Sequence, residues 1–533
     1  MQSKCLILSL AVVAALSFNV AGCDDDDDNT STLQATGLKK LTQLVSESEI
    51  VAHAHAFNTH YMYSIGGNNK LNIVNMGQPD SIRLINEVDL SPYGDEVQSV
   101  AANNERLVVA VAPDDAAAQK GAVVFFDNAG NFQQQVEVGY LPDMVTFNED
   151  GTQVIVANEG EPSDDYSTDP NGSIGLIDVA SYSYTDLSLN RTTTAAADGT
   201  PVRLGSTPSN NQVQDLEPEY ITVQGDYAYV TLQENNALAK VNLATPAVEW
   251  IKSLGAKSYA ADSGNTIDIE EEGEINMKAY DGLYGLYMPD TIASVSIGGT
   301  PYLLTANEGD GREYEYVSDA EDEASCDAQN GDWDNGECEV ISFIDESKIK
   351  DLDLAAAIAP QFVEENDLKV MTDLGQNAAG QYEQLYTYGT RSFSIWNENG
   401  DLVFDSGDQI SKLIAENDPE LFNQNDGEMD GRSGNKGGEP EAIAVGQVGE
   451  RYYTFVGLER QSVIIMFDIT DPNAPTMVQY YNAQDDNNLS PEGMKFISAD
   501  ESPNGKPLLL VAYEDGTDEA PQAAVVYEVT TAE

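Results

Sequence analysis

Residues 141–162 read LPDMVTFNEDGTQVIVANEGEP, and this stretch decides the fold. It begins with a proline and an acid and continues as a short run in which polar and apolar residues alternate. It then turns at Glu149-Asp150-Gly151 and returns as a second run that ends in further acids. Alternation with a period of two is typical of a half-buried strand, and Asp-Gly between two such runs is typical of a hairpin. The stretch is therefore predicted to be a β-hairpin with acidic residues at its open end.

The same unit recurs along most of the chain. Further copies occupy residues 49–67, 95–115, 216–236, 288–310, 438–460 and 490–515. After each copy comes another pair of short strands, for example SIGLIDV at 173–179 and SVIIMFDI at 462–469. Repeated units of four short strands are the signature of a β-propeller. The sequence therefore predicts an all-β fold, a seven-bladed β-propeller over residues 38–533.

The fifth unit is interrupted. Its first two strands lie within 291–307, and its outer two are predicted at 390–397 and 401–407. The residues between them, about 311–385, are predicted to be a loop and helix insertion in the fifth blade, with a helical stretch near 351–358. An eighth blade is the alternative interpretation.

The last unit shows only three clear strands, at 493–498, 507–513 and 523–529. Residues 38–45 are expected to supply the fourth strand and close the ring. Closure would remove the exposed sheet edges that an open propeller leaves.

The N-terminus has the features of an export signal. A lysine, a short apolar stretch over 6–16 and small residues lead to Val20-Ala21-Gly22-Cys23, which resembles a bacterial lipobox. We expect residues 1–22 to be a lipoprotein signal peptide, Cys23 to be lipidated, and residues 23–37 to form an acidic tether. This places the protein in a bacterial cell envelope, lipid-anchored to a membrane and facing the periplasm or the exterior. A secretory peptide cleaved elsewhere is the alternative.

The chain has four cysteines. Processing would remove Cys5 and acylate Cys23, which leaves Cys326 and Cys338 in a compartment where disulfides persist. We predict a disulfide between them that clamps a polar surface loop. A free catalytic thiol is the less favoured alternative, because neither cysteine has a histidine nearby in the sequence.

The charge balance narrows the class of protein. Asp and Glu number 91 against 25 Lys and Arg, which gives a formal charge of -66. Such a chain lacks the clustered cations that nucleic-acid binding requires. No apolar run reaches the roughly 18 residues of a transmembrane helix. An acidic surface of this kind suits a protein that holds cations.

Antiparallel pairing places the acid before the first strand of a unit beside the acid after its second strand. All units of a ring would then bring their acids to one mouth of the channel, where crowded carboxylates must gain protons, pair with cations or bind a metal. Calcium takes about 6–8 oxygen ligands and is the predicted cofactor, whereas zinc is disfavoured because histidine is scarce. Local pairing and turn capping are the alternative. The predicted metal ligands are Glu159, Glu161, Glu217, Glu219, Glu308, Asp310, Glu439, Glu441, Glu459, Glu492 and Glu514; Asp143, Glu234 and Asp290 occupy equivalent places in the pattern.

Several of the few cations lie beside these acidic motifs. They are Arg312, Arg391, Arg432, Lys436 and Arg460. Arginine suits bidentate phosphate recognition, so these residues are the predicted phosphate-binding set, with neutralisation of neighbouring glutamates as the alternative.

The three histidines are His53, His55 and His60. His53 and His55 share one face of a predicted strand, where they would either bind a metal or simply lie on the strand surface, and we favour the surface interpretation.

Several motifs resemble a known family. They are ANEGEPSDD (157–165), EPEYITV (217–223), YVTLQENNA (229–237), YMPDTIA (287–293), TANEGDGREY (305–314), YGTRSFSIW (388–396), VFDSGD (403–408), GGEPEAIAVG (437–446), FVGLER (455–460) and SPEGMKFI (490–497). This set resembles the choice-of-anchor I family. The resemblance implies an exported β-propeller with a surface anchor. It also implies a relationship to alkaline phosphatases and to a mesenchyme surface glycoprotein linked to biomineralisation.

Two functions follow as hypotheses. The first is a calcium-dependent phosphomonoesterase, in which carboxylate-held metal and arginine-held phosphate act on a phosphorylated small molecule. The second is a non-catalytic surface protein that binds calcium, mineral or a partner protein. No catalytic residue is identified for the first, and a Ser-His-Asp triad outside the histidine-bearing segment is excluded.

Overall fold

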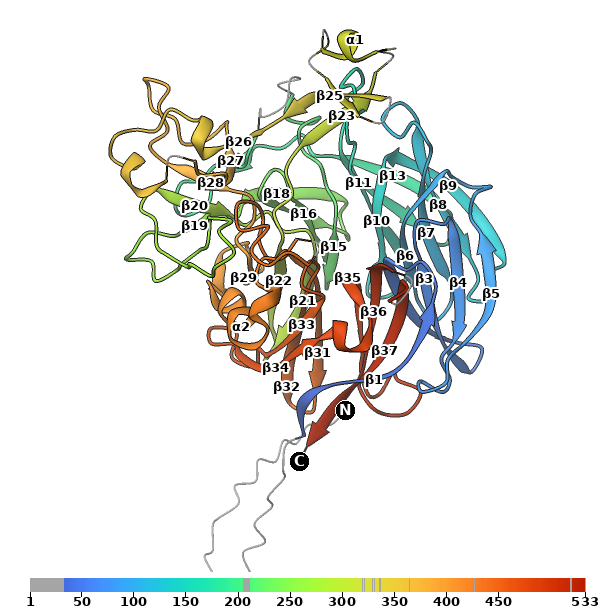
Figure 1. The fold of residues 1–533 in the computed structure, drawn as a ribbon. Helices are drawn as coiled ribbons and strands as arrows, with labels where there is room; N and C mark the ends of the chain where they lie inside the picture. The colour runs from blue at the N-terminus through green and yellow to red at the C-terminus, as the bar shows by residue number, and fades with distance from the viewer. Residues whose placement is uncertain are drawn as a thin grey trace, which may run out of the picture.

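The computed structural model describes residues 33–532 except 205–210, 319, 321, 328, 330, 335, 336, 364, 426, 518 and 519. The predicted signal peptide, Cys23 and the acidic run at 24–28 lie outside the described residues. Within them, the regular secondary structure is mainly antiparallel β-sheet (Figure 1). In the described part of the chain, no helix has the length and apolar character needed to cross a membrane.

Seven sheets of the described chain share one plan, a meander of four strands. Their members, sheet by sheet, are β2 (Ile50–Ala56), β3 (Thr59–Ile65), β4 (Lys70–Asn75), β5 (Arg83–Asp89); β6 (Glu96–Ala102), β7 (Leu107–Ala112), β8 (Lys120–Phe126), β9 (Phe132–Tyr140); β10 (Pro142–Phe147), β11 (Gln153–Asn158), β12 (Ser173–Asp178), β13 (Ser183–Ser188); β15 (Ile221–Gln224), β16 (Tyr227–Leu232), β17 (Ala237–Asn242), β18 (Ala247–Ser253); β21 (Ile292–Ile297), β22 (Thr300–Asn307), β29 (Ser392–Asn397), β30 (Leu402–Asp405); β31 (Pro440–Val448), β32 (Arg451–Leu458), β33 (Val463–Asp468), β34 (Thr476–Asn482); β35 (Leu489–Ile497), β36 (Leu508–Asp515), β37 (Ala523–Ala532), β1 (Gln34–Val45). The short β14 (Thr193–Thr194) adds a fifth strand beside β18.

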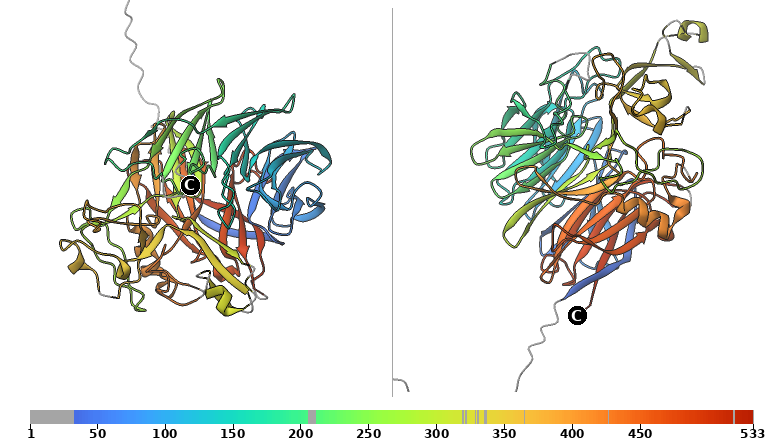
Figure 2. Two further views of the ribbon diagram at one scale, coloured as in Figure 1. Left: turned by 90° about the horizontal axis from the view of Figure 1, so that it is seen from above. Right: turned by 90° about the vertical axis from the view of Figure 1, so that its left-hand side faces the viewer.

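The sheets pack face to face in chain order. The first strand of each sheet contacts the first strand of the next, and β35 of the last sheet contacts β2 of the first. Apolar cores fill the spaces between neighbouring sheets, including the space where Leu510 and Val526 of the last sheet meet Met62 and Val74 of the first. This arrangement is a β-propeller, and Figure 2 shows the sheets from two further directions.

The last sheet joins the two ends of the described chain. Strand β1 pairs antiparallel with β37, with Leu38 opposite Val529 and Val45 opposite Ala523. The predicted contribution of the N-terminal segment to the last unit is therefore confirmed. The strand begins at Gln34, four residues before the predicted start of the propeller at residue 38.

A second region stands beside the sheets and has its own core. Residues of 254–286 and 345–388 build it, with Tyr259, Ile269 and Leu283 from the first segment and Leu368 and Val370 from the second. Its strands are β19 (Ala256–Ser258), β20 (Leu283–Leu286), β26 (Glu346–Lys348), β27 (Lys369–Met371) and β28 (Leu385–Thr387). The predicted helical stretch near 351–358 is wrong: two single 3-10 turns, Ile349–Asp351 and Ala359–Gln361, flank it. The longer described helix is α2 (Gln409–Asn417), which follows β30.

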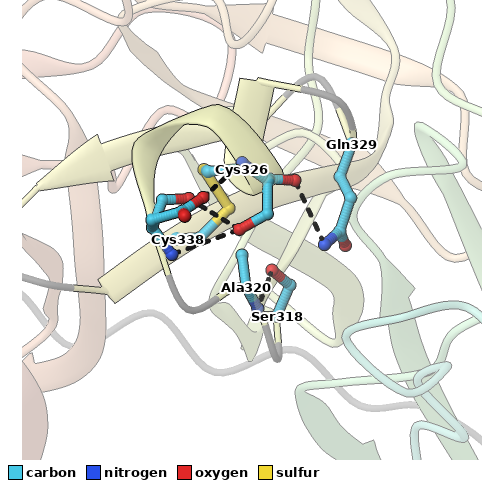
Figure 3. Close-up of a disulfide and its surroundings, with 7 residues drawn as sticks. Ser318, Ala320, Cys326, Gln329 and Cys338 are labelled. Atoms are coloured by element: carbon cyan, nitrogen blue, oxygen red, sulfur yellow. Dashed lines mark hydrogen bonds between the residues drawn. A yellow bond between two sulfur atoms is a disulfide. The ribbon is translucent and has the colours of Figure 1, made fainter.

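The predicted disulfide joins Cys326 to Cys338, with an S–S distance of 2.05 Å (Figure 3). Cys326 lies on α1 (Glu323–Asp327), and Cys338 lies on β25 (Glu337–Ile344), which pairs with β23 (Glu313–Val317) and β24 (Asp332–Asp334). Both cysteines are buried, and the Ser318 amide donates a hydrogen bond to the Cys338 carbonyl at 2.8 Å. The bridge therefore fastens a small sheet that projects from the end of the molecule opposite the termini, as Figure 1 shows.

Candidate metal site in an acidic mouth

Strand register brings the repeated acids to one place. Pro142 of β10 pairs with Asn158 of β11, so Asp143 and Glu159 lie at the same end of that hairpin. In the same way Pro440 opposite Leu458 aligns Glu441 with Glu459. We call the set of acids at these hairpin ends the acidic mouth; its members are Asp143, Glu159, Glu161, Glu217, Glu219, Glu234, Asp290, Glu308, Asp310, Glu439, Glu441, Glu459, Glu492 and Glu514.

A repeated backbone conformation precedes the acid at the start of the first strand in several units. In four units a residue with positive φ precedes a proline and then the acid; these residues are Leu141 (41°), Met288 (43°), Glu439 (41°) and Ser490 (55°). Positive φ is unfavourable for such side chains, and sites that keep it tend to be functional. In three of these units a β-bulge falls at the acid, namely at Asp143, Glu441 and Glu492. A β-bulge changes the direction of the side chain at the extra residue, so the carboxylate does not follow the two-residue alternation of the strand.

The charges of carboxylates on different sheets raise one another's pKa values. Burial and then the charge of Glu234 raise the pKa of Asp143 to about 6, and burial, Glu234 and Asp164 raise the pKa of Glu161 to about 7. Burial and Glu439 raise the pKa of Glu459 to about 8, and burial and Asp515 raise that of Glu514 to about 7. Burial and then the charge of Glu308 raise the pKa values of Asp290 and Glu441, and burial and then the charge of Asp290 raise that of Glu492. The structure therefore brings these acids into one electrostatic cluster.

Part of the cluster surrounds an open cavity of about 320 Å³, which we call the acidic cavity. It is lined by Asp143, Glu159, Glu161, Glu219, Gln233, Glu234, Asp290, Asp310, Gly311, Arg312, Glu313 and Tyr314. Four of these, Gln233, Gly311, Glu313 and Tyr314, were not among the predicted site residues. Glu313 and Tyr314 come from β23, outside the repeated units, so no internal repeat could have indicated them.

Glu219 is the least compensated carboxylate of this cavity. The residue is 8% exposed, and among the described residues neither carboxylate oxygen meets a basic, amide or hydroxyl partner; the group that bonds to it is the carboxyl of Glu234, through a hydrogen bond that needs a proton. One oxygen each of Glu234 and Asp290 is also buried without such a partner. Burial and the Glu234 charge raise the pKa of Glu219 well above its ordinary value. A buried carboxylate without a donor costs free energy unless a proton or a cation joins it.

A second group of acids lies further around the ring. Glu308, Glu441 and Glu459 each place one oxygen within 4.8 Å of the others. Lysine and arginine already reach this group: Lys436 Nζ lies 2.6 Å from Glu308 Oε1, and Arg460 lies 3.0 Å from Glu459 Oε1. These contacts leave the acidic cavity as the part of the mouth with the greater shortage of positive charge.

The five cations predicted to bind phosphate are already engaged. Buried Arg312 contacts Glu217 Oε2 at 2.5 Å, and Lys436 contacts Glu308 and Asp310. Arg432 and Arg460 both contact Glu439, which is 0% exposed. Arg391 donates to the backbone carbonyls of Asp268, Ser433 and Asn435 at 2.7–2.8 Å. The contacts of Arg312, Arg432, Lys436 and Arg460 are of the kind that the neutralisation alternative describes, whereas Arg391 is held by backbone carbonyls.

Five predicted metal ligands belong to these ion pairs, namely Glu217, Glu308, Asp310, Glu439 and Glu459, and of these Glu217 and Glu439 are the most deeply buried. Glu217 Oε2 accepts from the Arg312 guanidinium, and Glu439 is surrounded by Arg432, Lys436 and Arg460. Their charges are compensated by side chains of the protein, so we do not place them in a metal site. The predicted ligands that line the acidic cavity are Glu159, Glu161, Glu219 and Asp310, together with Asp143, Glu234 and Asp290 from the same pattern. Glu492 and Glu514 contribute charge from the last unit.

Known proteins resemble the chain in sequence. Residues 49–472 match the family model of the choice-of-anchor I domain. Gigasin-3a of Magallana gigas is 29% identical over 171 residues, which is 28% of this chain and 60% of that protein. The mesenchyme-specific cell surface glycoprotein of Strongylocentrotus purpuratus is 30% identical over 297 residues, or 51% of this chain. The match spans 37% of the glycoprotein, so the chain covers less than two thirds of either relative.

Two solved structures are similar in shape. Hydrazine synthase of Kuenenia stuttgartiensis aligns with a TM-score of 0.43 and 12% identity, covering 88% of this chain and 93% of that one. The β-propeller domain of Cps50 (Swd1) from Myceliophteria thermophila aligns with a TM-score of 0.45 and 9% identity, covering 92% and 100%.

Proposed function

The chain belongs to the choice-of-anchor I family, and from this premise we propose that it is an exported surface protein whose acidic cavity binds a calcium ion. One observation carries the proposal. Glu219 is buried in the cavity wall, where its carboxylate meets no basic, amide or hydroxyl partner among the described residues and faces the carboxyl of Glu234. A hard cation in the cavity would compensate Glu219 and the neighbouring acids together.

The donor set favours calcium over other common ions. Eight carboxylates line the cavity, and six of them come from the ends of three hairpins: Asp143, Glu159, Glu161, Glu219, Glu234 and Asp290. Calcium accepts about 6–8 oxygen ligands in flexible geometry, whereas magnesium demands a near-ideal octahedron. Zinc favours imidazole and thiolate, and the lining of the cavity contains neither. Arg312 is the basic residue of the lining, and it is held by Glu217 outside the cavity.

The architecture supports a surface role in our proposal. We propose that the seven sheets are the blades of a seven-bladed ring and that residues 308–391 are an insertion in the fifth. The chain enters β23 directly after Arg312, and β23 lies at the end of the molecule opposite the termini (Figure 1). With Cys23 lipidated and residues 24–33 as a tether, the inserted region would face away from the membrane. The surface glycoprotein relative is consistent with such a location.

Phosphomonoesterase activity stays a prediction of the family resemblance. Arg312, Arg432, Lys436 and Arg460 are paired with carboxylates, and Arg391 is saturated by backbone carbonyls. These contacts favour the non-catalytic alternative. An assay of aryl phosphate hydrolysis with calcium and with EDTA separates the two. We expect calcium binding without turnover, and hydrolysis that EDTA abolishes would restore the enzymatic hypothesis.

Calcium titration by calorimetry tests the binding proposal. The wild-type chain should bind calcium saturably, and Glu219→Gln should weaken the affinity by on the order of tenfold or more, because ligand charge sets calcium affinity. Glu105→Gln is the matched control, since the Glu105 side chain is 82% exposed on a turn between strands of the second sheet. Equal isotherms for wild type and Glu219→Gln would contradict the proposal, provided that both proteins show the same circular dichroism.

A further inference from the structure

The three histidines of the chain gather on one hairpin, away from the acidic mouth. His53 and His55 lie on β2, and His60 on β3 is directly opposite His55 in the register. The His53 Nε2 and His60 Nδ1 atoms are 3.2 Å apart. The His55 and His60 rings stack with centroids 4.2 Å apart and planes within 3°. The sequence showed that His53 and His55 share a face, but only the hairpin register adds His60.

The three histidines lie at the end of the propeller opposite the acidic mouth. Glu49, directly before β2, is among the charges that raise the pKa of Glu514 in the acidic mouth, so β2 runs from that mouth toward the opposite opening. Ala52, Ala54 and Ala56 are buried in the core shared with the second sheet, which leaves His53 and His55 on the other face. His55 is exposed, while His53 and His60 are half-buried, so solvent reaches the group through His55.

We propose that His53, His55 and His60 form a second metal site, specific for a divalent transition ion of the zinc class. The distance between the two facing nitrogens carries the argument. Zinc binds imidazole nitrogen at about 2.0–2.1 Å, and two tetrahedral ligands at that length lie about 3.3 Å apart. The observed 3.2 Å between His53 Nε2 and His60 Nδ1 fits this separation with little movement. The ion takes the place of the proton that the two nitrogens share, and His55 turns to supply the third nitrogen.

The donors distinguish this site chemically from the acidic cavity. Neutral imidazole suits zinc, copper and nickel, whereas carboxylates suit calcium and magnesium. Lys495 on β35 is the nearby cation, and the residue is exposed, so solvent screens its charge from a bound metal.

Zinc titration of the purified full chain tests the site. Calorimetry with zinc chloride is run in excess calcium, which occupies the acidic cavity and suppresses zinc binding to carboxylates. The wild-type chain should bind one zinc ion more tightly than the background. His60→Ala and His53→Ala should each weaken this binding roughly 100-fold, and His55→Ala should weaken it less, about tenfold, in line with the sensitivity of metal sites to loss of supporting groups.

Glu450→Gln, at an exposed turn away from both proposed sites, is the matched control. It should leave the zinc and calcium isotherms unchanged, and His60→Ala should weaken zinc binding without changing the calcium isotherm. Circular dichroism and melting curves establish that each variant is folded, and His60→Gln replaces the ring with a polar side chain if His60→Ala fails to fold. Zinc binding that survives in the His53→Ala/His60→Ala double variant, or the absence of saturable zinc binding in the wild type, overturns the proposal.

Discussion

Single side chains decide which acids of the mouth are free to hold an ion. Glu219 and Glu439 both belong to a Glu-Pro-Glu motif, Glu219 as its last residue and Glu439 as its first. Glu439 is surrounded by Arg432, Lys436 and Arg460, whereas Glu219 meets no basic, amide or hydroxyl partner among the described residues and faces the carboxyl of Glu234. The sequence pattern predicted the acids of the mouth but not their partners, because Arg432 and Arg460 reach Glu439 only through the fold.

Replacing Glu439 should therefore damage stability rather than calcium binding. Glu439→Gln leaves three cations around a neutral, fully buried side chain, and removing one partner of a buried ion pair costs about 3–5 kcal/mol. Urea unfolding measures this loss. Glu450→Gln, at an exposed turn of the hairpin that follows Glu439, is the control and should change the free energy of unfolding by less than about 0.5 kcal/mol. A Glu439→Gln variant as stable as the wild type would refute the structural role.

Whole strands were easier to predict than the irregularities between them. Period-two alternation and Gly-containing turns indicated the hairpins, and β10 and β11 fall inside the stretch 141–162. Alternation cannot indicate a bulge, because the extra residue appears only when two strands are paired, as at Asp143. Residues 254–286 were also missed as part of the second core, since their partners lie about a hundred residues away. The helix expected near 351–358 is absent because the chain leaves the 3-10 turn Ile349–Asp351 in an extended conformation at Leu352.

Strand β1 should be required for a stable propeller. It pairs along β37 and covers the edge of the last sheet, so its removal exposes an unpaired edge that promotes aggregation. A chain that starts at residue 46 should elute as aggregates in size-exclusion chromatography and melt at a lower temperature than a chain that starts at residue 33. If the two truncated chains are equally monomeric and equally stable, β1 is dispensable and the ring closes without it.

Across the molecule, the acids of the mouth make stability depend on pH. Folding raises the pKa of Glu161 to about 7 and that of Glu459 to about 8 from an ordinary 4.5. The folded chain therefore binds more protons than the unfolded chain between about pH 5 and pH 8, and its stability falls as pH rises through this window. Bound calcium would replace those protons and compensate the carboxylates.

Thermal melting across this window checks the linkage. In EDTA the melting temperature should fall from pH 5 to pH 8, and calcium at about 100 times its dissociation constant should restore about 2.7 kcal/mol at the upper end. Magnesium at the same concentration is the control and should restore less. A melting temperature that rises with pH in EDTA, or that responds equally to both ions, would conflict with a calcium-selective mouth.

Anomalous diffraction from crystals grown with calcium tests the central claim most directly. We expect an anomalous peak inside the acidic cavity, within about 2.3–2.6 Å of carboxylate oxygens that include those of Glu219. A cavity without a peak at saturating calcium, with Glu219 joined instead to a lysine or an arginine, would contradict the account.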